Sequence, residues 1–192
     1  NSVMYALRKF GIEETDRTKL YKFIGPPLTE SFEKFYGFTK EQSLDGVKYY
    51  REYYHDKGIY ENRVYDGLEE VLKKINEAGK QAIVATSKPE KYAKIIIDHF
   101  HLTQYFACVA GMEMDGGRGT KAQVITYALE KNDITDKSNV LMIGDREHDV
   151  IGAHENGLDC LGILYGFGSR KEFEEAGADY IRENVEDILQ FV

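Results

Sequence analysis

The stretch that decides the fold is Val140-Leu-Met-Ile-Gly144-Asp145-Arg-Glu-His-Asp149, an apolar run that ends in Gly-Asp and is followed by a second aspartate. The apolar run predicts a buried strand, and the residues after it predict the first turn of a helix. Both carboxylates should then lie close together at a strand end, where clustered oxygen ligands suit a hard cation such as Mg²⁺. Acidic residues also favour helix N-termini, which accounts for one aspartate but not for the whole pattern. We therefore predict that Asp145 and Asp149 hold a metal and that Gly144 lies against the substrate.

The chain around this stretch changes character near residue 62. Beyond it, apolar and β-branched runs alternate with helical patterns. The predicted strands are 81–86, 106–110, 139–143, 160–165 and 179–181, and the predicted helices are 66–78, 90–100, 121–131, 147–156, 170–176 and 185–191. Such alternation predicts an α/β fold, a doubly wound parallel sheet with helices on both faces. Since residues 1–62 show only helical patterns, we expect a small all-helical unit (1–62) joined to an α/β core (63–192).

The helical unit should contain four helices. The first ends at Gly11, the second covers 16–24 and the third covers 28–36. Thr39 and Gln42 have the spacing of a capping box, in which each side chain bonds the other residue's backbone amide. This pair predicts the start of the fourth helix.

Two other segments of the core carry polar residues where a strand ends or a helix begins. Thr86, Ser87 and Lys88 follow a β-branched run, and a hydroxyl beside free helix amides forms an anion site. The ordinary alternative is that Ser87 caps the next helix, with Pro89 in its first position. Lys121 opens a helix, although a cation is electrostatically favoured at the opposite end. We interpret Thr86, Ser87 and Lys88 as a candidate anion site, because ligands bind at the carboxyl ends of parallel strands. The electrostatically unfavourable place of Lys121 is a hint that this residue is functional.

Composition limits the classes of partner. The formal net charge is -8, which disfavours nucleic acid, because affinity there comes largely from Lys and Arg on phosphates. No apolar run approaches the roughly 20 residues of a membrane span, and no signal peptide is visible. Cys108 and Cys160 both lie in apolar runs, so we expect buried, reduced thiols and a cytoplasmic protein.

These motifs, taken in order, resemble those of the haloacid dehalogenase superfamily, specifically its branch of phosphoglycolate phosphatases and 5′-nucleotidases with a helical cap. The resemblance implies that the Thr86 hydroxyl bonds the transferring phosphoryl group and that Lys121 neutralises negative charge. It also implies that Asp145 ligates Mg²⁺ and that Asp149 supports a metal-bound water or the lysine. Residues 1–62 would be the cap, with the loop Gly25–Leu28 as a candidate substrate contact.

The resemblance implies a Mg²⁺-dependent phosphatase that hydrolyses a small phosphomonoester, phosphoglycolate or a nucleoside monophosphate, through an aspartyl-phosphate. The family's Asp-x-Asp-Gly-Thr motif, which supplies the nucleophile and the general acid/base, is absent from residues 1–192. We expect the natural protein to contain that segment and residues 1–192 alone to be inactive. A phosphosugar mutase and a non-catalytic phosphate-binding relative are the alternatives.

Overall fold

A computed structural model describes residues 1–24, 26–113 and 117–192. The chain divides into two compact units, Asn1–Arg63 and Val64–Val192. Among the helices of these described ranges, none has the length and apolar character needed to cross a bilayer.

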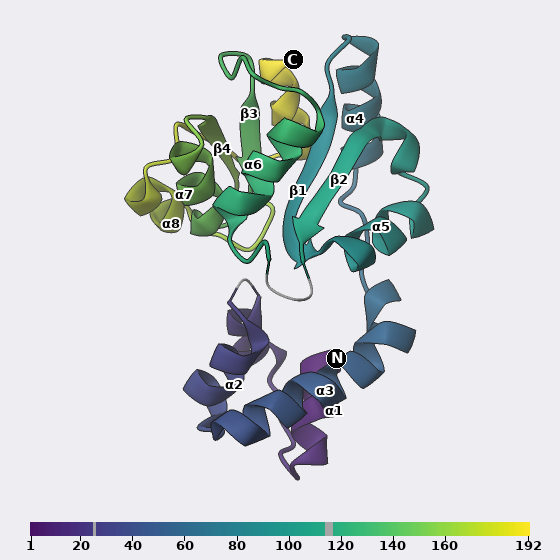
Figure 1. Ribbon diagram of the computed structural model, residues 1–192, viewed down its shortest axis with the longest axis vertical. Coiled ribbons are helices and arrows are strands. Elements are labelled where there is room, and N and C mark those ends of the chain that lie inside the picture. Colours follow the sequence, from purple (N-terminus) through teal and green to yellow (C-terminus); the bar gives the residue numbers. More distant parts are fainter. Residues whose placement is uncertain (25, 114–116) are drawn as a thin grey trace. The chain divides into compact units, whose positions relative to one another are not determined.

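The first unit consists of helices only. Its elements are α1 (Ser2–Lys9), η1 (Arg17–Phe23), α2 (Leu28–Tyr36), α3 (Lys40–Asp56) and η2 (Gly58–Tyr60). Both α1 and α2 pack against α3 (Figure 1). The capping box at Thr39 and Gln42 is confirmed, with both of its hydrogen bonds present. The segment 16–24, expected as an ordinary helix, is a 3₁₀ helix that begins after Asp16, whose carboxylate accepts the Thr18 amide.

The second unit is of α/β type and its strands are parallel, as predicted. Its strands are β1 (Ala82–Pro89), β2 (Phe106–Met112), β3 (Leu141–Gly144), β4 (Asp159–Ile163) and β5 (Tyr180–Arg182). They form two ladders, β1 with β2 and β3 with β4 and β5, rather than one continuous sheet. In Figure 1 the strand β3 lies on the β1 side of its own ladder.

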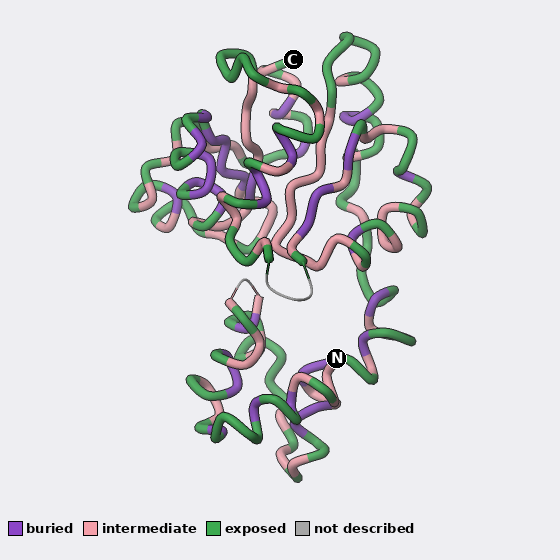
Figure 2. Tube along the Cα trace, viewed as in Figure 1, coloured by how far each residue is buried: buried purple, intermediate pink, exposed green. Residues whose placement is uncertain are grey.

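Helices cover the strands of the second unit. They are α4 (Leu68–Glu77), α5 (Glu90–His99), η3 (Thr103–Tyr105), α6 (Lys121–Lys131), α7 (Glu147–Glu155), α8 (Arg170–Ala176) and η4 (Val185–Phe191). α6 packs on β1 and β2, α7 packs on β3 and β4, and the two helices contact each other. In β4, Cys160 belongs to one apolar cluster and Leu161 to another, so side chains cover both faces of this ladder. The trace of β4 is coloured mostly as buried in Figure 2. Cys108 and Cys160 are buried free thiols, as expected.

The junction between β1 and α5 differs from the expectation. The strand continues to Pro89, which pairs with Met112 after a register shift. Pro89 is therefore the residue before the helix rather than its first residue, and α5 has no side-chain cap. The alternative in which Ser87 caps this helix and Pro89 is its first residue is therefore wrong, because pairing with β2 extends the strand to Pro89.

Candidate active site

A cavity of about 620 Å³ lies at the facing edges of β1 and β3. Its lining includes Thr86 from β1, Lys121 from α6, Gly144 from β3, and Asp145 and Asp149 from the segment after β3. They come from three segments that are far apart in the sequence, the end of β1, the start of α6 and residues 144–149. The ends of β1 and β3 lie at one edge because parallel strands present their carboxyl ends on the same side. The structure thus brings together five of the seven residues that the sequence nominated.

Lys121 is the cation of this group. Thr120 and Gln123 form a capping box that fixes the first turn of α6, where the lysine lies. Its Nζ donates to the Ala85 carbonyl oxygen at 2.9 Å and lies 2.8 Å from Asp149 Oδ1. The side chain is only 11% exposed, so the ammonium group is held in one place with two oxygen partners. A Cβ at Gly152 would lie 2.7 Å from the lysine Cγ, so this glycine makes room for the side chain.

Asp149 organises the segment that follows β3. Its Oδ2 accepts the backbone amides of Asp145 and Arg146, at 2.9 and 3.1 Å, while its Oδ1 faces Lys121. The residue is buried, and Gly144 is needed beside it because a Cβ there would lie 2.2 Å from the Asp149 Cβ. Both oxygens of Asp149 therefore have nitrogen donors.

Asp145 is held by the segment that follows β4. Its Oδ2 accepts the Phe167 amide at 3.1 Å. Cβ atoms placed on Gly166 and Gly168 would approach Asp145 to 2.3 and 2.4 Å, so only glycine permits this close packing. Burial raises the pKa of the Asp145 carboxyl, and the nearby Asp149 adds to this, against the opposing Phe167 hydrogen bond. A bound cation would offset the cost of ionising this carboxylate, so its surroundings fit a metal ligand.

The three candidate residues at the end of β1, Thr86, Ser87 and Lys88, do not all line the cavity: only Thr86 does. The Lys88 amide donates to the Thr86 hydroxyl oxygen at 3.1 Å. Of the described residues, Ser87 and Lys88 are not among those that line the cavity. Burial lowers the pKa of Lys88. Within residues 1–24, 26–113 and 117–192 there is no group of three or more His, Cys, Asp or Glu side chains that could hold a metal, so Asp145 and Asp149 are a pair rather than a complete ligand set.

The segment Tyr165–Gly168 belongs to the candidate site through contacts that the sequence reasoning did not assign. Tyr165 and Phe167 line the cavity, and the Phe167 amide holds Asp145. The signal that could have found it is the pair of glycines, Gly166 and Gly168, directly after a strand end.

The facing edges of β1 and β3 are themselves a feature of the site. Within the described part of the chain, β1 pairs only with β2, and β3 only with β4. A second cavity, of about 370 Å³, also touches both strands and is lined by apolar side chains of α6, including Ile125 and Leu129. We call the space between the β1 and β3 edges, bounded by these two cavities, the inter-strand slot.

Comparison with known proteins identifies the family to which the chain belongs. The family described as haloacid dehalogenase-like hydrolase matches residues 1–163. A 5′-nucleotidase of Pseudomonas aeruginosa is 43% identical over 171 residues, 89% of this chain and 77% of that protein. The tyrosine-protein kinase PtkA of Mycobacterium tuberculosis is 32% identical over 88% of this chain but only 57% of its own length.

A solved structure agrees with this result. The crystal structure of a predicted phosphatase from Clostridium acetobutylicum has 45% sequence identity and a TM-score of 0.91, and the match covers 98% of this chain and 87% of that one. Sequence and fold lead to the same assignment: the chain belongs to the haloacid dehalogenase-like hydrolase family, among its phosphatases.

Proposed function

We propose that this phosphatase depends on Mg²⁺ and hydrolyses a nucleoside monophosphate, with phosphoglycolate as the second candidate substrate. The observation that carries the proposal is the largely buried Lys121 ammonium group, which bonds Ala85 and Asp149 and lines the same cavity as Thr86 and Asp145. The 43% identical relative is named a 5′-nucleotidase, which favours the nucleotide over phosphoglycolate.

The chain's own residues supply charge and orientation. A phosphate dianion and an anionic nucleophile repel each other, and Lys121 offsets that repulsion most strongly where water is excluded. Thr86 offers a hydroxyl to a phosphoryl oxygen. Asp145 is the better candidate metal ligand, because both Asp149 oxygens already accept from nitrogen donors. A bound Mg²⁺ would supply further positive charge beside the phosphoryl group.

We propose that the nucleophile lies on a strand that occupies the inter-strand slot. The facing edges of β1 and β3 have no strand partner among the described residues, and the linings on both sides are apolar. Such edges suit an extended apolar segment, which would satisfy the backbone groups of β1 and β3. A strand in this position would end between Thr86 and Asp145. We propose that such a strand carries the aspartate that attacks phosphorus and forms the aspartyl-phosphate.

The proposal also covers the role of the helical unit and the cellular compartment of the protein. We propose that residues 1–62 act as a cap that admits the substrate and excludes water. The loop expected to contact substrate, Gly25–Leu28, includes Gly25, which lies outside the described residues. The two buried thiols fit a reducing compartment, and we propose the cytoplasm.

The proposal is tested on the full-length natural protein with a phosphate-release assay. The panel contains adenosine and uridine 5′-monophosphate, phosphoglycolate and glucose 6-phosphate, each with Mg²⁺ and with EDTA. We expect release from the nucleotides that requires Mg²⁺, and loss of that release in Asp145→Asn. Conversion of a hexose phosphate to its isomer would favour the mutase alternative. Phosphate binding without turnover would favour the non-catalytic one.

A further inference from the structure

We propose that Arg118 is a positioning residue for Lys121, which fixes the first turn of α6 against the ends of β2 and β1. Arg118 is not among the described residues that line the cavity. The inference rests on the proposed function, because the position of the Lys121 amine matters for the rate only if this amine offsets charge during phosphate hydrolysis. It concerns Arg118 and the residues that it contacts, which are Gly111, Glu113, Glu90 and Tyr127.

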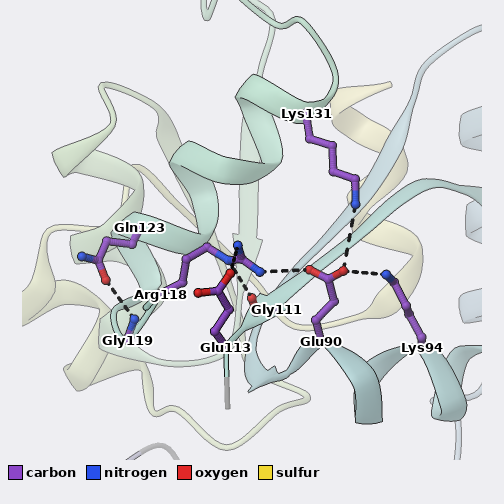
Figure 3. Close-up of polar contacts among 8 residues, drawn as sticks. All are labelled: Glu90, Lys94, Gly111, Glu113, Arg118, Gly119, Gln123 and Lys131. Carbon is purple, nitrogen blue, oxygen red and sulfur yellow. Dashed lines mark hydrogen bonds and ion pairs between the residues drawn. The ribbon is translucent and has the colours of Figure 1, made fainter. Parts of the chain in front are cut away.

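The guanidinium group of Arg118 bonds three residues, two near the end of β2 and one at the start of α5 (Figure 3). Its Nε donates to the Gly111 carbonyl oxygen in β2 at 3.2 Å, and its Nη1 lies 2.6 Å from Glu113 Oε1. Its Nη2 lies 3.3 Å from Glu90 Oε2 in α5. The Glu113 amide also donates to the Arg118 carbonyl oxygen at 3.3 Å. Every nitrogen of the planar guanidinium fork has an acceptor, a pattern that lysine cannot reproduce.

The fourth contact reaches the helix that carries Lys121. The guanidinium carbon of Arg118 lies 3.8 Å from the centre of the Tyr127 ring, and Tyr127 belongs to α6. Gly119 and Thr120 lie between Arg118 and Lys121 in the sequence. Their backbone amides donate to the Gln123 side-chain oxygen at 2.9 and 3.1 Å. Each residue from Arg118 to the start of α6 is therefore held by a direct contact.

Glu90 connects this cluster to the other phosphate contact. It is the first residue of α5, immediately after the strand that carries Thr86. The ends of β1 and β2 are closely packed here, since a Cβ on Gly111 would lie 2.6 Å from the Glu90 Cα. Both members of the Arg118–Glu90 pair are largely buried, at 19% and 17% side-chain exposure. One side chain therefore ties the lysine segment to the threonine segment.

Loss of the Arg118 contacts should lower kcat more than it changes KM. Lys121 offsets charge that is greatest in the transition state, and a misplacement of about 1 Å can cost about 10²-fold in rate. We expect Arg118→Ala to lower kcat by about 10- to 100-fold while KM changes by less than about threefold. Arg118→Lys keeps the charge but loses the planar guanidinium group, so its kcat should lie between those of the unaltered enzyme and Arg118→Ala.

The experiment compares Arg118→Ala and Arg118→Lys with Arg170→Ala in the full-length enzyme. Arg170 is the matched control, because its side chain is 52% exposed and pairs only at the surface, with Glu183. Millimolar guanidinium should restore part of the kcat of Arg118→Ala, since the ion fits between Glu90, Glu113 and the Tyr127 ring, whereas urea should not. Melting curves establish that each variant is folded during the assay.

A second measurement does not depend on turnover. Lys121 reacts slowly with an amine acetylating reagent if it is buried and paired, and mass spectrometry reports its rate. We expect faster acetylation of Lys121 in Arg118→Ala and an unchanged rate in Arg170→Ala.

The outcomes separate the two proposals. An active enzyme whose kcat and Lys121 acetylation are both unaffected by Arg118→Ala overturns the positioning role and leaves the proposed function standing. If the unaltered enzyme releases no phosphate, the proposed function fails, and acetylation alone decides the role of Arg118. Equal rescue by guanidinium and urea also overturns it, because the effect would then be general solvation.

Discussion

Replacement of Asp149 by alanine gives the sharpest test of how the site is held together. The carboxylate has three partners, the Lys121 ammonium group and the backbone amides of Asp145 and Arg146. All three lose an acceptor in Asp149→Ala, and the ammonium group stays buried with only the Ala85 carbonyl oxygen.

The magnitude follows from burial. The side chains of Lys121 and Asp149 are 11% and 8% exposed, so outside the cavity that both residues line the ion pair is shielded from water. Removing one member of a buried ion pair costs about 3–5 kcal/mol of unfolding free energy. The exposed pair Lys171–Glu175, at 81% and 69% exposure, is the control, and Glu175→Ala should change stability by less than about 0.5 kcal/mol.

The assay is urea denaturation of the full-length protein, followed by far-ultraviolet circular dichroism. A double-mutant cycle with Lys121→Met isolates the pair, and we expect the double variant to be more stable than additivity predicts by about 1–3 kcal/mol. Additive effects, or an Asp149→Ala loss no larger than that of Glu175→Ala, would refute the claim that this pair organises the site.

Three further predictions concern the surroundings of the site. Gly166→Ala places a Cβ 2.3 Å from the Asp145 Cβ, so it should cost about 1–3 kcal/mol in urea denaturation. Because it displaces Asp145, the proposed metal ligand, it should also raise the Mg²⁺ concentration that phosphate release needs. Burial raises the pKa of the Cys160 thiol to about 12; the thiolate is therefore scarce at pH 8, and a thiol-reactive disulfide reagent should label Cys160 only after unfolding. Although burial opposes the shift, hydrogen bonds from Arg146 and the Glu147 amide lower the pKa of Glu172 below its ordinary 4.5. The stability that Glu172 contributes is present above that pH and is lost as the pH falls through the folded-state pKa, so acid should destabilise Glu172→Gln less than the unaltered protein.

Local chemistry explains why much of the core could be predicted from sequence. β-Branched runs and glycine stops locate strands and helices, and the helix predicted at 121–131 has those bounds in the structure. The end of β1 was misplaced because pairing with β2, a long-range contact, extends it to Pro89. The 3₁₀ character of Arg17–Phe23 was also missed, since apolar spacing does not distinguish the two kinds of helix over so short a segment.

The candidate site was only partly accessible to such reasoning. The Gly-Asp pattern predicts acidic residues at a strand end, but not that both oxygens of Asp149 turn to nitrogen donors. That arrangement depends on α6 packing against α7, with Gly152 making room for the lysine. The guanidinium contacts of Arg118 were hidden for the same reason, because its partners lie in three separate elements.

The ammonium group of Lys121 also has a mechanical consequence. One of its partners, Ala85, belongs to the β1–β2 ladder, and the other, Asp149, follows the β3 strand of the second ladder. A single nitrogen atom thus spans two halves of the core that share no backbone pairing in the described chain. Any anion that draws this nitrogen away from either partner loosens the link, so occupancy of the cavity should register as altered amide hydrogen exchange in β1 and β3.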